Sequence, residues 1–161
     1  MAESTLECES EREFHKLYDE KPKNLELVER VLGVNLVARG TSLKISGDEK
    51  NLFKCEELFS LLNLGQSHGI TPKGADFLRF VERVDSGQTQ DLRDLVTNPL
   101  VLKIRKTSIV PRNLSQRRFL DLILQHDLVF GIGPAGTGKT FLAMIVALDS
   151  LLKGEVQRIV L

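Results

Sequence analysis

"FGIGPAGTGKT", residues 130–140, is the stretch that decides the fold. From Gly133 to Thr140 it contains a glycine, four further residues, and then Gly-Lys-Thr, a pattern typical of loops that hold phosphate groups. Glycines let the backbone turn sharply and bring its N–H groups close to phosphate oxygens. A helix that begins directly after such a loop adds the positive end of its dipole. A glycine-rich turn with a purely structural role is the alternative.

The flanking residues favour the phosphate-loop interpretation. "DLVFGIG" (127–133) suits a buried parallel strand, and "KTFLAMIVALDSLLKG" (139–154) suits an apolar helix that ends at its final glycine. "VQRIVL" (156–161) suits another buried strand. Strand, loop, helix and strand form one βαβ unit, so the sequence predicts the α/β class and the start of a parallel sheet of the P-loop NTPase type.

Each polar residue of the loop has an expected role. Lys139 can reach the β- and γ-phosphates as a point charge, and Thr140 can place its hydroxyl on Mg²⁺, so these two are the candidate catalytic residues. Thr140 is also the candidate metal ligand. A nucleoside triphosphate and Mg²⁺ are therefore the expected cofactors, and the loop itself does not decide between ATP and GTP. The candidate nucleotide-binding residues of the loop are Gly133, Pro134, Ala135, Gly136, Thr137, Gly138, Lys139 and Thr140.

Gln116 is a further candidate, on a helix expected over "SQRRFLDLILQH" (115–126). A carboxamide has both a donor and an acceptor, so it can pair with the edge of adenine. The alternative is a solvated residue on the helix surface. Asp149 lies within the helix that follows the loop and not at a strand end, which makes it a poor magnesium ligand.

The sequence before the loop predicts four segments. Residues 1–23 are expected to be an acidic, mobile N-terminus, and residues 24–64 a small α+β domain with the order helix, strand, strand, helix. Residues 65–99 contain glycines and a proline and are expected to be a linker with helical segments. Residues 100–161 are expected to be the N-terminal part of a P-loop ATPase domain that is incomplete, either because the sequence is a fragment or because the gene is truncated.

Charge and composition exclude some classes of protein. The formal net charge is zero, so the total gives no indication of a nucleic-acid or membrane partner. Six bases and no acid lie within residues 103–118; they form either a contact surface for nucleic acid or a solvated face. No apolar run is long enough to span a membrane, and the two cysteines, Cys8 and Cys55, have no metal-binding spacing. We therefore expect a cytoplasmic protein.

"VFGIGPAGTGKTFL" (129–142), preceded by Pro111-Arg112 and Gln116, resembles the PhoH-like family of ATPases. The family's loop is related to those of superfamily 1 helicases, in which an upstream glutamine contacts adenine. The resemblance therefore implies that Gln116 is an adenine contact. It also implies that residues 24–64 are KH-like, although they contain no Gly-x-x-Gly loop of the kind with which KH domains hold a nucleotide backbone.

The resemblance implies an ATP-binding protein whose complete form is an ATPase linked to RNA metabolism. Its expected partners are ATP and RNA or RNA-processing proteins, with no membrane partner and with oligomers possible. The sequence contains no identifiable carboxylate for the metal or for the attacking water. The alternative function is a non-catalytic binding or interaction module, or an inactive remnant of such an ATPase.

Overall fold

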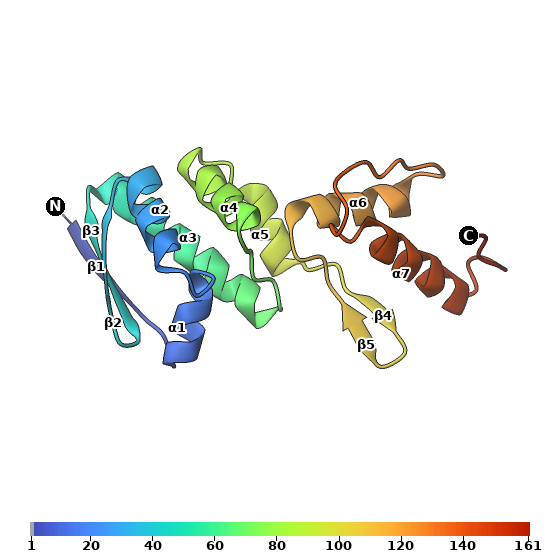
Figure 1. Cartoon of the computed structure of the whole chain (residues 1–161), viewed down its shortest axis with the longest axis horizontal. Coiled ribbons are helices and arrows are strands. Elements are labelled where there is room, and N and C mark those ends of the chain that lie inside the picture. Colours follow the sequence, from blue (N-terminus) through green and yellow to red (C-terminus); the bar gives the residue numbers. More distant parts are fainter. Residues whose placement is uncertain (1) are drawn as a thin grey trace. The chain divides into compact units, whose positions relative to one another are not determined.

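A computed structural model describes residues 2–161, which combine helices with short antiparallel strands. Figure 1 follows the chain by colour from the N-terminus to the C-terminus. Two compact units can be separated, Met1–Thr97 and Asn98–Leu161. None of the helices in the part of the chain described is both long and apolar enough to cross a membrane.

The first unit contains a three-stranded antiparallel sheet. Its strands are β1 (Ala2–Glu7), β2 (Asn35–Arg39) and β3 (Ser42–Gly47), in the order β1-β3-β2. β2 and β3 form a hairpin that turns at Gly40, whose positive φ of 57° is readily adopted by glycine. On the central strand, Leu43 and Ile45 are buried and Lys44 is exposed, so one face of the sheet contributes to the core.

The helix, strand, strand, helix order predicted for residues 24–64 is confirmed. α2 (Pro22–Leu32) precedes the hairpin, and α3 (Glu49–Ser67) follows it. α2 ends where expected, because Gly33 is left-handed with φ 66° and donates its N–H to the Glu29 carbonyl. Asp48 is the N-cap residue of α3, but its side chain makes no capping hydrogen bond.

The expectation of a mobile acidic segment over residues 1–23 is wrong. Residues 2–7 form β1, which pairs with β3, and α1 (Glu11–Leu17) follows. The alternation of exposed and half-buried side chains along β1 was hidden by its acidic residues. α1 is capped by Ser10, whose hydroxyl accepts from the N–H of Glu13, and it contributes Phe14 and Leu17 to the core. Buried apolar side chains therefore hold the segment in place.

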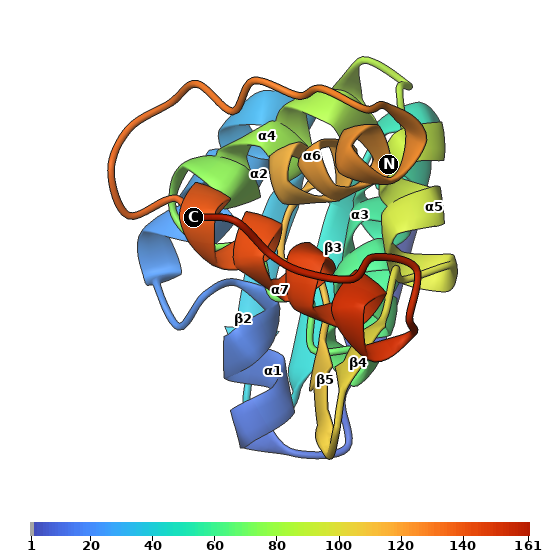
Figure 2. The same cartoon turned by 90° about the vertical axis from the view of Figure 1, so that its right-hand side faces the viewer.

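The expected linker over residues 65–99 is also part of the first unit. It contains α4 (Ala75–Asp85), which packs on α2 and α3, and α5 (Gln90–Thr97), which packs on α3. Figures 1 and 2 show these helices beside α3. Phe77 and Val81 are fully buried. At Gly65 a Cβ atom would lie only 2.9 Å from the Ile70 carbonyl oxygen, so this glycine permits close packing and does not mark a flexible joint.

The second unit is built from a β-hairpin and two helices. The hairpin consists of β4 (Leu102–Ile104) and β5 (Thr107–Ile109), and the helices are α6 (Leu114–Gln125) and α7 (Lys139–Leu152). α7 packs on both α6 and β4. The buried core of the unit consists of Leu102, Leu120, Leu142 and Val146.

The two buried parallel strands expected over residues 127–133 and 156–161 do not form. Both segments are irregular, and Phe130 and Ile132 are 79% and 95% exposed. A parallel strand needs hydrogen-bonded neighbours, and the strands of the second unit in the described residues, β4 and β5, pair only with each other. The apolar runs therefore remain without a sheet.

Candidate functional site

The glycine-rich loop lies directly before α7 and is exposed to solvent. Gly136 and Gly138 have φ values of 77° and 88°, a region that side chains with a Cβ atom adopt at a cost. Gly138 is also the N-cap residue of α7. The φ angle of Gly133, by contrast, is not positive. The two later glycines therefore set the shape of the turn that leads into the helix.

The Lys139 side chain folds back over its own loop. Its Nζ donates to the Pro134 carbonyl oxygen at 2.6 Å and lies 3.2 Å from the Thr137 hydroxyl. That hydroxyl in turn donates to the same carbonyl at 3.0 Å. The ammonium group is thus held against the loop by two oxygen acceptors, which gives the loop a defined form.

The first turn of α7 leaves backbone donors available. The helical pattern of hydrogen bonds starts with Leu142 N–H to the Gly138 carbonyl, at 2.9 Å. The N–H groups of Lys139, Thr140 and Phe141 have no backbone acceptor within residues 2–161. Thr140 is exposed, and its side chain makes no hydrogen bond in the same residues. These donors and the hydroxyl can all receive a ligand.

Gln116 lies against the loop although 21 residues separate it from Thr137. Its Nε2 donates to the Thr137 carbonyl oxygen at 3.2 Å, and its Oε1 accepts from the N–H of Arg112 at 2.8 Å. A Cβ atom at Gly138 would lie 3.2 Å from the same Nε2. Gln116 is therefore a bridge between the residues before α6 and the loop, and not a solvated residue of the helix surface.

Two residues that help to position the site were missed in the sequence. Asn113 caps α6 by accepting the N–H of Gln116 at 2.9 Å, which fixes the start of the helix. The pattern Asn-x-x-Gln is similar to a capping box and could have revealed it. Phe119 lies against Gly131, where a Cβ atom would approach its ring to 2.9 Å. A glycine within an apolar run was the available signal.

Carboxylates and bases of α6 and α7, the helices on either side of the glycine-rich loop in the sequence, form structural contacts. Asp149 is 5% exposed and pairs with Lys153 at 2.6 Å, an interaction that raises the pKa of the Lys153 ammonium. Arg117 pairs with Asp121 and donates to the Asn98 carbonyl, so it is not free to contact a nucleic-acid backbone. Across residues 2–161, no group of three His, Cys, Asp or Glu side chains is arranged to hold a metal.

Comparison with known proteins gives a consistent family relationship. The family model described as "PhoH-like protein" matches residues 108–161. The chain is 35% identical to the PhoH-like protein of Mycobacterium leprae. The match covers 86% of this chain and 40% of that protein. It is 28% identical to the PhoH-like protein of Bacillus subtilis, covering 90% of this chain and 46% of the relative. It is 31% identical to the PhoH-like protein of Synechocystis, covering 86% of this chain and 42% of the relative.

The chain thus spans less than half the length of these curated relatives. No solved structure matches it. The family match includes the whole glycine-rich loop together with Gln116.

Proposed function

Because the chain belongs to the PhoH-like protein family, we propose that residues 133–140 bind the phosphates of ATP together with Mg²⁺. The position of Lys139 carries this proposal. Its ammonium group lies against the loop on two oxygen acceptors, which phosphate oxygens can replace with a stronger, charge-assisted contact. The available N–H groups at the start of α7 add donors for the same phosphates.

Each residue of the loop has a separate proposed role in binding. Gly136 and Gly138 keep the backbone turned so that its N–H groups face the phosphates, and Lys139 neutralises their charge. Thr140 would hold Mg²⁺, which would withdraw negative charge from the phosphates. Lys139 has to release the Pro134 carbonyl to reach the phosphates, so binding exchanges hydrogen bonds and does not simply add them.

Gln116 is the proposed adenine contact. A carboxamide has two donor hydrogens and two acceptor lone pairs, and each group of Gln116 uses one of them in the contacts with Thr137 and Arg112. One donor and one acceptor remain, which is the pair that adenine requires. The same residue would then connect the base to the phosphate loop through the Thr137 carbonyl.

For the complete protein we propose an ATPase linked to RNA metabolism, with RNA or RNA-processing proteins as its partners. The α/β sheet of a P-loop enzyme and a KH-like character for residues 24–64 belong to the same proposal. Positioning and electrostatic stabilisation account for most of phosphoryl-transfer catalysis, and Lys139 and Thr140 would supply part of both. Cys8 and Cys55 are unpaired thiols, which is consistent with a cytoplasmic location.

A non-catalytic nucleotide-binding module is the second candidate. One observation favours it: Asp149, the carboxylate of the helix that follows the loop, is buried and paired with Lys153. Without a carboxylate for the metal or the attacking water, these residues would bind nucleotide but not hydrolyse it. Magnesium-dependent phosphate release by the chain would decide between the two candidates.

Titration with a fluorescent ATP analogue in Mg²⁺ tests the binding proposal. Lys139→Ala removes a charge-assisted contact, and we expect affinity to fall about ten- to hundredfold. Lys106→Ala is the matched control, because Lys106 is an exposed lysine of the same unit without an ion pair in the described residues. Equal affinity of both variants and the parent chain would refute the assignment.

The base preference provides a separate test of Gln116. Gln116→Ala should weaken ATP more than GTP, since the adenine edge would lose its partner. Competition titrations with the two nucleotides measure the ratio. An equal loss for both would mean that Gln116 acts only through the shape of the loop.

A further inference from the structure

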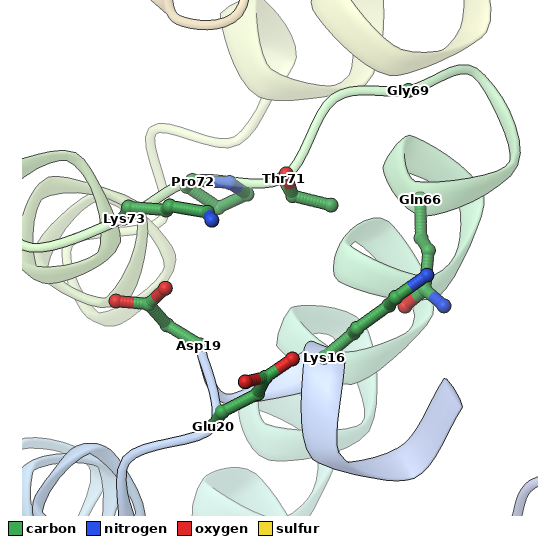
Figure 3. Close-up of a pocket in the computed structure, with 8 residues that line it drawn as sticks. All are labelled: Lys16, Asp19, Glu20, Gln66, Gly69, Thr71, Pro72 and Lys73. Atoms are coloured by element: carbon green, nitrogen blue, oxygen red, sulfur yellow. The ribbon is translucent and has the colours of Figure 1, made fainter. Parts of the chain in front are cut away.

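A second candidate site lies in the first unit, away in sequence from the glycine-rich loop. A cavity of about 280 Å³ opens where α1 and α3 both end, and Figure 3 shows side chains that line it. Charged and polar side chains reach it from several elements: Lys16 from α1, Glu20 from the turn that follows, Gln66 from α3, and Thr71 and Lys73 from the segment before α4. It is near the lower end of the volumes of small-molecule sites.

Several charged or polar groups of this cavity have no partner. The Gln66 Oε1 atom is buried and accepts no hydrogen bond. Within residues 2–161, Lys16, Glu20 and Lys73 take part in no ion pair. A buried acceptor without a donor costs stability, so such an atom calls for an explanation. The cavity therefore offers two ammonium groups and two acceptors, Glu20 and Gln66 Oε1.

The turn that presents the carboxylates has an unusual backbone. Asp19 and Glu20 are consecutive non-glycine residues with φ values of 58° and 56°. Side chains with a Cβ atom rarely occupy this left-handed region, and residues held there cluster at binding sites. The conformation brings both carboxylates to the rim of one cavity.

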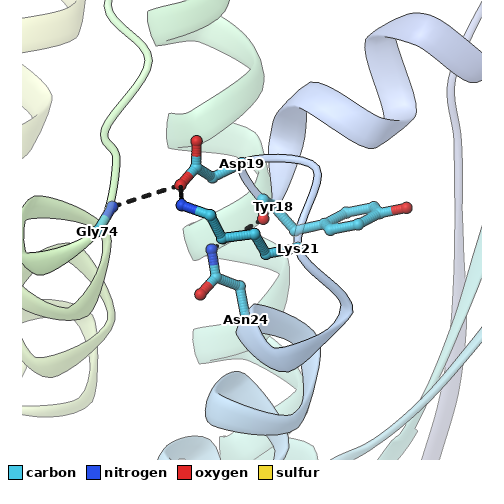
Figure 4. Close-up of polar contacts among 5 residues, drawn as sticks. All are labelled: Tyr18, Asp19, Lys21, Asn24 and Gly74. Atoms are coloured by element: carbon cyan, nitrogen blue, oxygen red, sulfur yellow. Dashed lines mark hydrogen bonds and ion pairs between the residues drawn. The ribbon is translucent and has the colours of Figure 1, made fainter.

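Hydrogen bonds fix this turn in place, as Figure 4 shows. The Asp19 side chain is only 7% exposed; it accepts from Lys21 Nζ at 2.6 Å and from the Gly74 N–H at 3.4 Å. Asn24 Nδ2 donates to the Tyr18 carbonyl at 2.9 Å. Asp19 is thus engaged in holding the cavity together, and Glu20 remains available to a ligand.

We propose that this cavity binds a small zwitterion of the free amino-acid class. The carboxylate of the ligand would lie between Lys16 and Lys73, and its ammonium group would donate to Glu20 and to Gln66 Oε1. Every unpartnered group of the cavity then has a partner of opposite polarity. The small volume fits a ligand with a short side chain better than one with a large group.

The same residues disfavour a nucleotide or a nucleic acid. No aromatic side chain is among the residues that line the cavity, so a base would have nothing on which to stack. Asp19 is paired with Lys21, and Glu20 at the rim offsets one of the two lysines and would repel a phosphate dianion. The helices that reach the cavity do so with their C-terminal ends, which favour cations over anions.

The test is a heteronuclear NMR titration of the whole 161-residue chain with the common free amino acids at millimolar concentration. Binding is expected for a subset with short side chains, with amide shifts in residues 16–20 and 66–73 and none in residues 133–140. The matching hydroxy acid, which lacks the ammonium group, and the matching amine, which lacks the carboxylate, should each bind more weakly. Shifts confined to other residues, or no shifts at all, would overturn the proposal.

Two substitutions test separately the contact to the ligand's carboxylate and the contact to its ammonium group. Lys73→Gln and Glu20→Gln should each weaken the amino acid about tenfold, because each removes one charged contact. Lys50→Gln, an exposed residue at the start of α3, is the matched control and should bind like the parent chain. If the control is weakened as much as the other two, the ligand is held by the overall charge and not by this cavity. Should a variant fail to fold, the shift map of the parent chain still decides.

Discussion

Gly138→Ala is the substitution that most directly probes how the glycine-rich loop keeps its form. At φ 88° an alanine pays about 1–2 kcal/mol for the left-handed backbone. Its Cβ atom would also lie 3.2 Å from Gln116 Nε2, tighter than an ordinary contact, so the amide has to move away from the Thr137 carbonyl. Loss of that hydrogen bond adds about 1 kcal/mol. The free variant loop is expected to relax away from this form, and binding then has to restore it at a cost of about 2–3 kcal/mol, which predicts a loss of ATP affinity of about 30- to 150-fold.

Gly136→Ala separates the two contributions. Gly136 also has a positive φ, of 77°, but no atom lies within 4 Å of the position its Cβ would occupy. It pays only the backbone cost, so we expect a loss of about 5- to 30-fold. In a Gln116→Ala background the contact at Gly138 no longer exists, and the two glycine substitutions should have the same effect.

The assay is titration with a fluorescent ATP analogue in Mg²⁺ for the parent chain, the single variants and the double variants. Urea unfolding of each variant checks that the free energy of unfolding of the second unit is retained. Equal free energies of unfolding for Gly138→Ala and Gly136→Ala exclude a difference in stability as the cause of a difference in affinity. If Gly138→Ala weakens ATP no more than Gly136→Ala while Gln116 is present, the bridge from Gln116 to the loop has no energetic role.

Two further predictions concern the first unit. Phe77→Ala should lower its free energy of unfolding by about 3–5 kcal/mol in urea, since Phe77 is fully buried, whereas Phe53→Ala, at a residue 65% exposed, should change it by less than about 0.5 kcal/mol. A small loss at Phe77 would argue that α4 is not part of this core. Burial raises the pKa of Cys55 to about 12, so near pH 8 roughly one thiol in ten thousand is ionised, and a thiol reagent should modify Cys8 well before Cys55 in the native chain.

The elements that were predicted correctly are those whose signals lie within a few neighbouring residues. Gly33 ends α2 because only the left-handed conformation of a glycine satisfies the last carbonyls of that helix at little cost. The hairpin turn at Gly40 has the same kind of local cause. The strand at residues 2–7 was missed because its partner, β3, lies about forty residues further along, and its acidic residues suggested a solvated segment.

Tertiary context also explains the error over residues 127–133. An apolar run followed by glycine predicts a buried strand only if neighbouring strands are present to receive its backbone hydrogen bonds. Phe130 and Ile132 lie in solvent here, although their side chains are apolar. The apolar residues of such a segment indicate that it needs neighbouring strands, but they do not indicate which strands would pair with it.

The position of the loop could be predicted from the sequence, but the contacts of its residues could not. The spacing of Gly133 to Thr140 led to a loop before a helix, and the structure has that loop before α7. Spacing alone could not show that Lys139 bonds to Pro134, because that contact depends on how the loop turns. It could not show that Gln116 bonds to Thr137 either, because that contact depends on how α6 packs on α7. The nucleotide itself remains a proposal for these residues.

These contacts have a consequence for the energetics of nucleotide binding. Lys139 donates to a carbonyl, and the Thr137 hydroxyl both receives from Lys139 and donates to that carbonyl. If the loop binds phosphate as proposed, the ligand replaces these hydrogen bonds, so the net gain is smaller than the strength of the new contacts alone. The same contacts hold the loop near one conformation beforehand, which lowers the entropy that binding must remove. Gln116 strengthens this second effect from outside the loop, and its loss should therefore weaken any ligand of the loop, and adenine nucleotides most.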